Sequence, residues 1–152
     1  MDPLSVAASS AGLLGLCIHL SKTISGFIQG SRQVDISLQA LQSEIDGLRE
    51  VLTCIETSFK DPQYADAALK ATTGHEKLHW KSVETSMINC ESTLTDLIKV
   101  LDRVKKGNSF AILNRAIKQI KLSINTSEIS AYKQLIQHYK ETMHLSLQII
   151  TV

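Results

Sequence analysis

Glycine, proline and aromatic residues are scarce in this chain of 152 residues. It has seven glycines and two prolines, and aromatic residues make up 5%. A β-sandwich or β-barrel needs many turns built from glycine and proline, and strands rich in β-branched and aromatic side chains. The composition therefore excludes an all-β fold and favours an all-α one. With 43% hydrophobic and 20% charged residues, it also excludes a disordered chain, and the length fits one domain.

The chain also lacks an excess of charge of one sign. Sixteen basic and 15 acidic residues give a formal net charge of +1. Nucleic-acid-binding domains are typically strongly basic, so we expect no nucleic-acid partner. The charges are unevenly distributed, because seven acids lie between residues 35 and 66 and seven bases lie between residues 96 and 121.

Cysteine is too rare for a disulfide framework. The three cysteines, Cys17, Cys54 and Cys90, are odd in number, widely spaced and set within apolar helical patterns. This usage is typical of reduced thiols in the cytoplasm, which is where we expect the protein to be.

The N-terminal segment is unusually apolar, since no formal charge occurs from Leu4 to Ser21. Such a run is near the minimum length for a membrane span. A secretory signal should open with basic residues, whereas this chain opens with Met1-Asp2-Pro3, and the run itself contains serines, glycines and a histidine. We therefore expect neither a signal peptide nor a constitutive span. Pro3, capped by Asp2, predicts a helix that runs to about Ile28 and stops before Gly30.

Helical periodicity divides this first helix into two faces. The bulky face consists of Val6, Leu13, Leu16, Leu20, Ile24 and Phe27, and the small face of Ala8, Gly12, Gly15, His19 and Gly26. Leu14 and Ile18 lie beyond the small face. Because the helix is apolar on nearly every side, we expect it to be a central helix of a bundle, buried on most sides at rest.

Two strict heptad seams predict two further long helices. The first seam is Leu38, Leu41, Ile45, Leu48, Leu52, Ile55 and Phe59, and the second is Val83, Met87, Cys90, Leu94, Leu97, Leu101 and Val104. Asp61-Pro62 predicts a short helix between them that closes by Gly74. The sequence Lys105-Lys106-Gly107 predicts the end of the second long helix.

The remaining apolar pattern changes register once. Ser109 is expected to cap a helix with Phe110, Leu113, Ile117, Ile120 and Ile124 on one face. A break at Thr126-Ser127 precedes a last seam of Ile129, Tyr132, Ile136, Tyr139 and Met143. The prediction is an all-α, up-and-down bundle of four long helices, with one extra short or broken helix, in a single domain over residues 1–152. Since the apolar pattern persists to Ile149-Ile150, we expect the polypeptide to continue beyond Val152.

The N-terminal sequence resembles the HeLo-like domain at the head of fungal NLR-type (STAND) receptors. The resemblance rests on Met1 to Ser9 (MDPLSVAAS) and on Ala11 to Leu14 (AGLL). The spacing of Cys90, Leu94 and Leu97 is similar to the third helix of that family, and Lys133 to Gln148 is similar to its closing helix. One departure is Leu122, where the family favours tryptophan.

The resemblance implies a helical bundle without an active site or cofactor, followed in the same chain by a nucleotide-binding domain. Related domains permeabilise membranes when they oligomerise, through an apolar N-terminal helix. It therefore implies self-association, recruitment to the plasma membrane and regulated cell death. The residues expected to insert or oligomerise are Leu4, Ala8, Gly12, Leu13, Leu14, Gly15 and Ile18. The rival hypothesis is a scaffold domain that makes protein contacts only.

Two other patterns in the sequence have functional interpretations. A basic run could attract anionic lipid headgroups, although a solvated bundle face is the favoured interpretation. It comprises Lys99, Arg103, Lys105, Lys106, Arg115, Lys118 and Lys121. His75, Glu76 and His79 match the H-E-x-x-H zinc pattern, but no third ligand or adjacent strand is apparent, so we expect neither a metal site nor enzymatic activity.

Overall fold

The computed structural model describes residues 3–30, 36–71, 74, 77–109 and 126–151. Within these ranges the chain forms five helices, α1 (Pro3–Gly30), α2 (Ile36–Ser58), α3 (Pro62–Ala71), α4 (Lys77–Ser109) and α6 (Thr126–Thr151). No strand occurs among the described residues, and the predicted all-α class is confirmed. The helix predicted after Ser109 falls in residues 110–125, outside the described residues.

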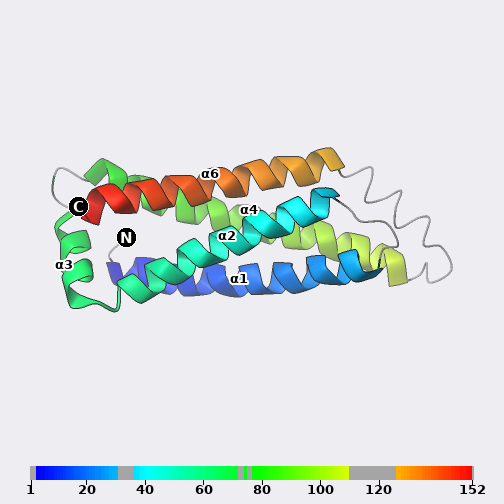
Figure 1. Ribbon diagram of the computed structural model, residues 1–152, viewed down its shortest axis with the longest axis horizontal. Coiled ribbons are helices and arrows are strands. Elements are labelled where there is room, and N and C mark those ends of the chain that lie inside the picture. Colours follow the sequence, from blue (N-terminus) through cyan, green and yellow to red (C-terminus); the bar gives the residue numbers. More distant parts are fainter. Residues whose placement is uncertain (1–2, 31–35, 72–73, 75–76, 110–125, 152) are drawn as a thin grey trace.

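The four long helices form an elongated bundle in which successive helices alternate in direction (Figure 1). α1 packs on α2 and α4, and α6 packs on α4 and α2, so that α2 and α4 lie diagonally across the bundle. The first turns of α1 and the last turns of α6 lie at the same end. There α3 carries the chain across the bundle from α2 to α4 and contacts α1, α4 and α6.

Both heptad seams are buried, as their spacing predicts, except that Phe59 at the end of the first seam is half-buried and follows the last residue of α2. Every seam residue of α2 from Leu38 to Ile55 is at most 3% exposed, and those of α4 from Val83 to Val104 are at most 7% exposed. The two seams belong to one core cluster together with apolar residues of α1 and α6. They therefore face each other across the centre of the bundle, and their adjacent neighbours are α1 and α6.

Local signals account for one helix boundary and fail at two others, the first of which is the end of α1, since α1 includes Gly30 and does not stop before it. The Asp61 carboxylate accepts a 2.9 Å hydrogen bond from the backbone N–H of Gln63, so Asp61-Pro62 starts α3 as predicted. The predicted end of α4 at Gly107 is wrong, because α4 continues to Ser109. A glycine stop needs a positive φ, and none of the described glycines has one. Ser109 is consequently the last residue of α4.

Polar contacts between helices fix their register. The Ser21 hydroxyl donates to the Asp46 carboxylate at 2.9 Å, which joins α1 to α2. Lys140 of α6 pairs with Glu44 of α2 at 2.8 Å. The hydroxyls of Thr93 in α4 and Tyr139 in α6 lie 3.2 Å apart. Because these contacts are specific in position along the helices, they select one register among those the apolar seams allow.

The three cysteines should differ sharply in reactivity. Cys17 and Cys90 are buried, and burial raises the pKa of each thiol to about 12, whereas Cys54 is exposed. A thiol with that pKa is a thiolate only to about one part in ten thousand at pH 8, and the thiolate is the nucleophile. We expect Ellman's reagent to label one thiol quickly in native protein and three in urea. Rapid labelling of all three in native protein would show that the α1–α4 interface is open.

Candidate functional site

The candidate site is the side of α1 that points away from the bundle. The side chains of α1 that enter the core lie on one stripe: Val6, Ser10, Leu13, Cys17, Leu20 and Ile24. The opposite side is exposed and is made mostly of small residues: Ala8, Ala11, Gly12, Gly15, Ile18, His19, Lys22 and Gly26. We call this set the outer face of α1.

The expectation that α1 is buried on most sides is wrong. In the stretch Ser5–Gln29, only 22% of the most apolar window is buried. The reason is topological, since α1 packs mainly on α2 and α4 and none of the other long helices in the described ranges lies against its outer face. By length and composition, α1 is the one described helix that could cross a membrane, and the 25 residues of Ser5–Gln29 are more than a hydrocarbon core of about 30 Å requires.

The structure separates the residues predicted to insert or oligomerise. Ala8, Gly12, Gly15 and Ile18 lie together on the outer face. Leu14 is half-buried and packs against the core, and Leu13 is 3% exposed and belongs to the core. Leu4 lies in the first turn of α1, and its side chain is outside the described part of the chain. At rest the predicted set is therefore not one surface, because the bundle holds Leu13 away from solvent.

The polar residues of α1 are of two kinds. The Ser10 hydroxyl donates to the Val6 carbonyl at 2.9 Å, and the Thr23 hydroxyl donates to the His19 carbonyl at 3.0 Å. Such bonds within one helix remain satisfied wherever the helix goes. By contrast, Ser21 bonds to Asp46, and Gln42 of α2 donates to the Ser25 hydroxyl at 2.6 Å. Of these hydrogen bonds, the two that join α1 to α2 lie in the C-terminal half of α1.

The glycines of the outer face border open space. A Cβ atom built at Gly12, Gly15 or Gly26 meets nothing within 4 Å. Glycine inside a helix costs stability relative to alanine, so packing at rest does not explain these residues. These glycines are therefore not needed for packing within the resting bundle, and a role for them requires another molecule that contacts the outer face.

Gly12→Ala and Gly15→Ala are each expected to raise the free energy of unfolding by about 0.5–1 kcal/mol. Gly47→Ala is the matched comparison, because a Cβ there lies 3.2 Å from the Lys140 Nζ, and we expect a smaller gain. Urea denaturation of the three variants measures these differences. A loss of stability in the first two would mean that the outer face is packed against something.

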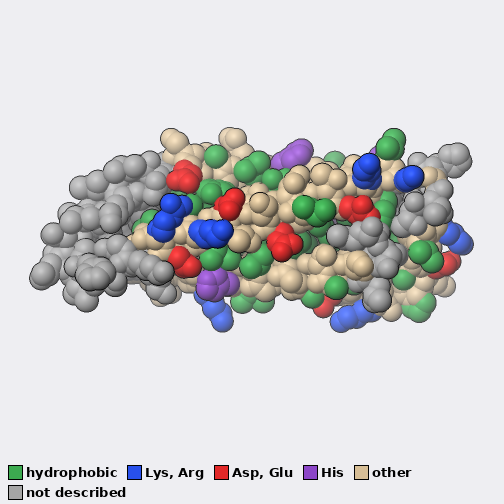
Figure 2. Space-filling view, turned by 180° about the vertical axis from the view of Figure 1, so that it is seen from behind, with side chains coloured by type: hydrophobic (Ala, Val, Ile, Leu, Met, Phe, Trp, Pro, Cys, Tyr) green, Lys and Arg blue, Asp and Glu red, His purple; other side chains and the backbone are tan. Residues whose placement is uncertain are grey.

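The basic run is described only in part. Lys99 and Arg103 are exposed on α4, and the Arg103 Nε donates to the Lys99 carbonyl at 3.4 Å. Lys105 and Lys106 lie in α4, but their side chains are outside the described residues, as are Arg115, Lys118 and Lys121 altogether. On the face shown in Figure 2, basic side chains are interspersed with acidic ones. The described bases therefore form no continuous field of one sign there.

Two of the three H-E-x-x-H residues, His75 and Glu76, fall outside the described residues, and His79 is half-buried in the first turn of α4. Among the described residues, no three His, Cys, Asp or Glu side chains come together as potential metal ligands.

These features define a class of protein, an all-α bundle whose apolar first helix exposes a face of small residues. The family model of the N-terminal domain of the pigment biosynthesis cluster protein PigL matches residues 1–152. The chain belongs to this family and is an N-terminal helical domain of the fungal type. Comparisons with curated proteins and with solved structures give no match.

Proposed function

We propose that this domain is the signalling and execution module of a fungal NLR-like receptor, as in HeLo-like domains. Clustering of the receptor would drive its bundles together and bring α1 to a membrane, with regulated cell death as the result. The observation that carries the proposal is the outer face of α1, which consists mostly of small residues, has no acidic residue and has Lys22 as its one formal charge. None of the described long helices covers it in the resting bundle, and an ordinary surface helix of a bundle carries several charged residues on that side.

Release of α1 from the bundle would be opposed in water and favoured by a membrane. Val6, Leu13, Leu20 and Ile24 are all but fully buried. Exposing four such side chains to water costs about 6–12 kcal/mol, at 1.5–3 kcal/mol each. Hydrocarbon removes most of this cost, because lipid tails are as apolar as the core. The resting state is therefore stable in solution, and α1 needs both an apolar destination and a trigger.

The small residues of the outer face would serve self-association. In hydrocarbon, helices associate through small side chains because their backbones can then approach closely. Gly12 and Gly15 leave such space on α1. Lys22 and His19 lie towards the C-terminal half of the helix, where a long cationic side chain can extend to the headgroups. Several copies of α1 could thus pack together with their glycines in contact.

The proposal also includes the cellular location of the domain and the domain that follows it. We place it in the cytoplasm, with recruitment to anionic lipids of the plasma membrane on activation and a nucleotide-binding domain following in the same chain. The free thiols of Cys17 and Cys90, both buried, suit a reducing compartment. The proposal assigns the domain no catalytic role, no cofactor and no nucleic-acid partner.

Dye release from liposomes tests the proposal against the scaffold alternative. The domain would be fused to a chemically dimerised or trimerised module and added to vesicles of anionic or zwitterionic lipid. We expect release only when the fusion is clustered, and more of it from anionic vesicles. If the clustered protein releases no dye while it still self-associates in solution, the scaffold function takes the place of the membrane function.

A further inference from the structure

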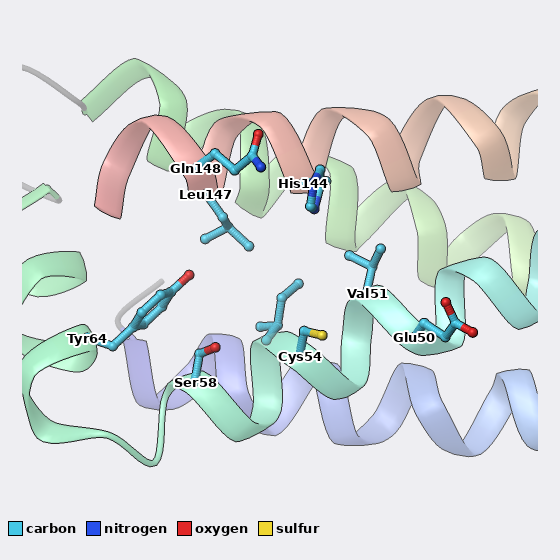
Figure 3. Close-up of a pocket in the computed structure, with 9 residues that line it drawn as sticks. Glu50, Val51, Cys54, Ser58, Tyr64, His144, Leu147 and Gln148 are labelled. Carbon is cyan, nitrogen blue, oxygen red and sulfur yellow. The ribbon is translucent and has the colours of Figure 1, made fainter. Parts of the chain in front are cut away.

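A cavity of about 350 Å³ opens between α2, α3 and α6, on the side of the bundle away from the α1–α4 contact (Figure 3). Its apolar wall is formed by Val51, Ile55 and Leu147. Such a volume lies at the lower end of the range for small-molecule sites, and those sites are likewise mostly apolar with a few polar groups. α3, which carries Tyr64, lies at one end of the cavity (Figure 3).

The polar lining of this cavity is asymmetric. Tyr64 and Ser58 lie at the end near α3, and Glu50 lies at the opposite end, as Figure 3 shows. His144 reaches in from α6, facing Cys54 of α2. Glu50 is the one acidic residue among the described lining residues, and none of these is a lysine or arginine. Glu50 therefore supplies the one formal charge of this described lining.

We propose that this cavity binds an aliphatic amine, with its hydrocarbon chain along Val51, Ile55 and Leu147 and its ammonium group beside Glu50. Charge complementarity favours an amine over a carboxylate, which the Glu50 carboxylate would repel. Hydroxyl groups near the other end of such a ligand would meet Ser58 and Tyr64. No residue of α1 lines this cavity, so a test of amine binding is independent of the test of membrane activity.

Cys54 provides a direct readout, since its sulfur lies within the cavity and it is the exposed one of the three cysteines. Alkylation of native protein by iodoacetamide would be followed with decylamine, decanol or decanoate present. We expect decylamine to slow the modification of Cys54 at least fivefold, decanol to act more weakly and decanoate to have the least effect.

Two pairs of variants give the controls. Ser58→Phe fills the cavity and should abolish protection, whereas Thr57→Phe, one residue earlier and exposed, should not. Glu50→Gln should weaken decylamine binding about two- to fivefold, the range for an exposed ion pair, and leave decanol unchanged. Glu56→Gln, on the same helix outside the cavity, should leave both unchanged. For the Glu50 and Glu56 variants, protection of Cys54 would be measured at increasing concentrations of decylamine and of decanol.

Four results would overturn the proposal. Equal protection by decanoate removes the charge argument, and protection that survives Ser58→Phe places the probe elsewhere. No protection by any probe means that the cavity binds no aliphatic chain. Protection that rises with protein concentration in the absence of a probe assigns the cavity to contact with a second copy of the chain.

Discussion

Gly12→Glu and Gly15→Glu are each expected to reduce dye release by the clustered domain to the level of vesicles alone. A charged side chain at the centre of a spanning helix is opposed by about 2.5–3.5 kcal/mol on insertion scales. That energy corresponds to roughly a 60- to 300-fold shift against insertion. The effect should be multiplied in an oligomer, because each copy of α1 brings its own charge to the place where the helices meet.

The same substitutions should leave the resting bundle intact. A side chain at either position enters open space, and glutamate is a better helix former than glycine. Gly12→Gln is the matched variant without charge, and Ser43→Glu adds the same charge on the exposed side of α2. Circular dichroism and urea denaturation would confirm that all variants are folded. If the folded glutamate variants release dye as well as the wild type, α1 has no membrane role.

Leu48→Ala is expected to lower the free energy of unfolding by about 2–5 kcal/mol, the largest stability effect that we predict. Leu48 is fully buried at the centre of the α2 seam, where its removal leaves a cavity among large side chains. The cost combines the lost transfer free energy with the energy of that cavity. Leu145→Ala is the control, since Leu145 is 58% exposed and its loss should cost no more than about 0.5 kcal/mol.

The measurement is urea denaturation followed by far-ultraviolet circular dichroism. A change within 0.5 kcal/mol for Leu48→Ala would contradict the burial of the α2 seam and the register of the bundle with it. An equal loss in both variants would show that Leu145 is covered by a second molecule.

The long helices with a regular seam could be placed from the sequence. In α2 and α4 the seam residues recur alternately every 3 and 4 positions. A helix with this pattern buries one face regardless of which helices pack against it. The seam of α6 follows the same rule, with Ile129, Ile136 and Met143 buried. The Asp61-Pro62 start of α3 was also predictable, because its capping chemistry is local.

The candidate sites were predictable only in part. The small face of α1 follows from its periodicity, yet no property of the sequence states whether another helix covers it. The cavity had no sequence signal at all, since His144 of α6 lies far along the chain from Cys54 of α2 and Tyr64 of α3. The packing of α6 on α2 and on α3 brings them together.

The sequence by itself determined that the chain is all-α, which residues of α2, α4 and α6 face the core, and that α1 has no formal charge from Leu4 to Ser21. These properties depend on composition and on contacts within one helix, and they hold for many arrangements of the helices. The tertiary structure alone decided that α2 and α4 lie diagonally and that α1 is buried on one stripe. It also decided that α4 passes through Gly107. Each of these features depends on which helices become neighbours. Heptad seams alone allow several arrangements of the helices, and small differences in packing and in polar contacts between helices select one of them.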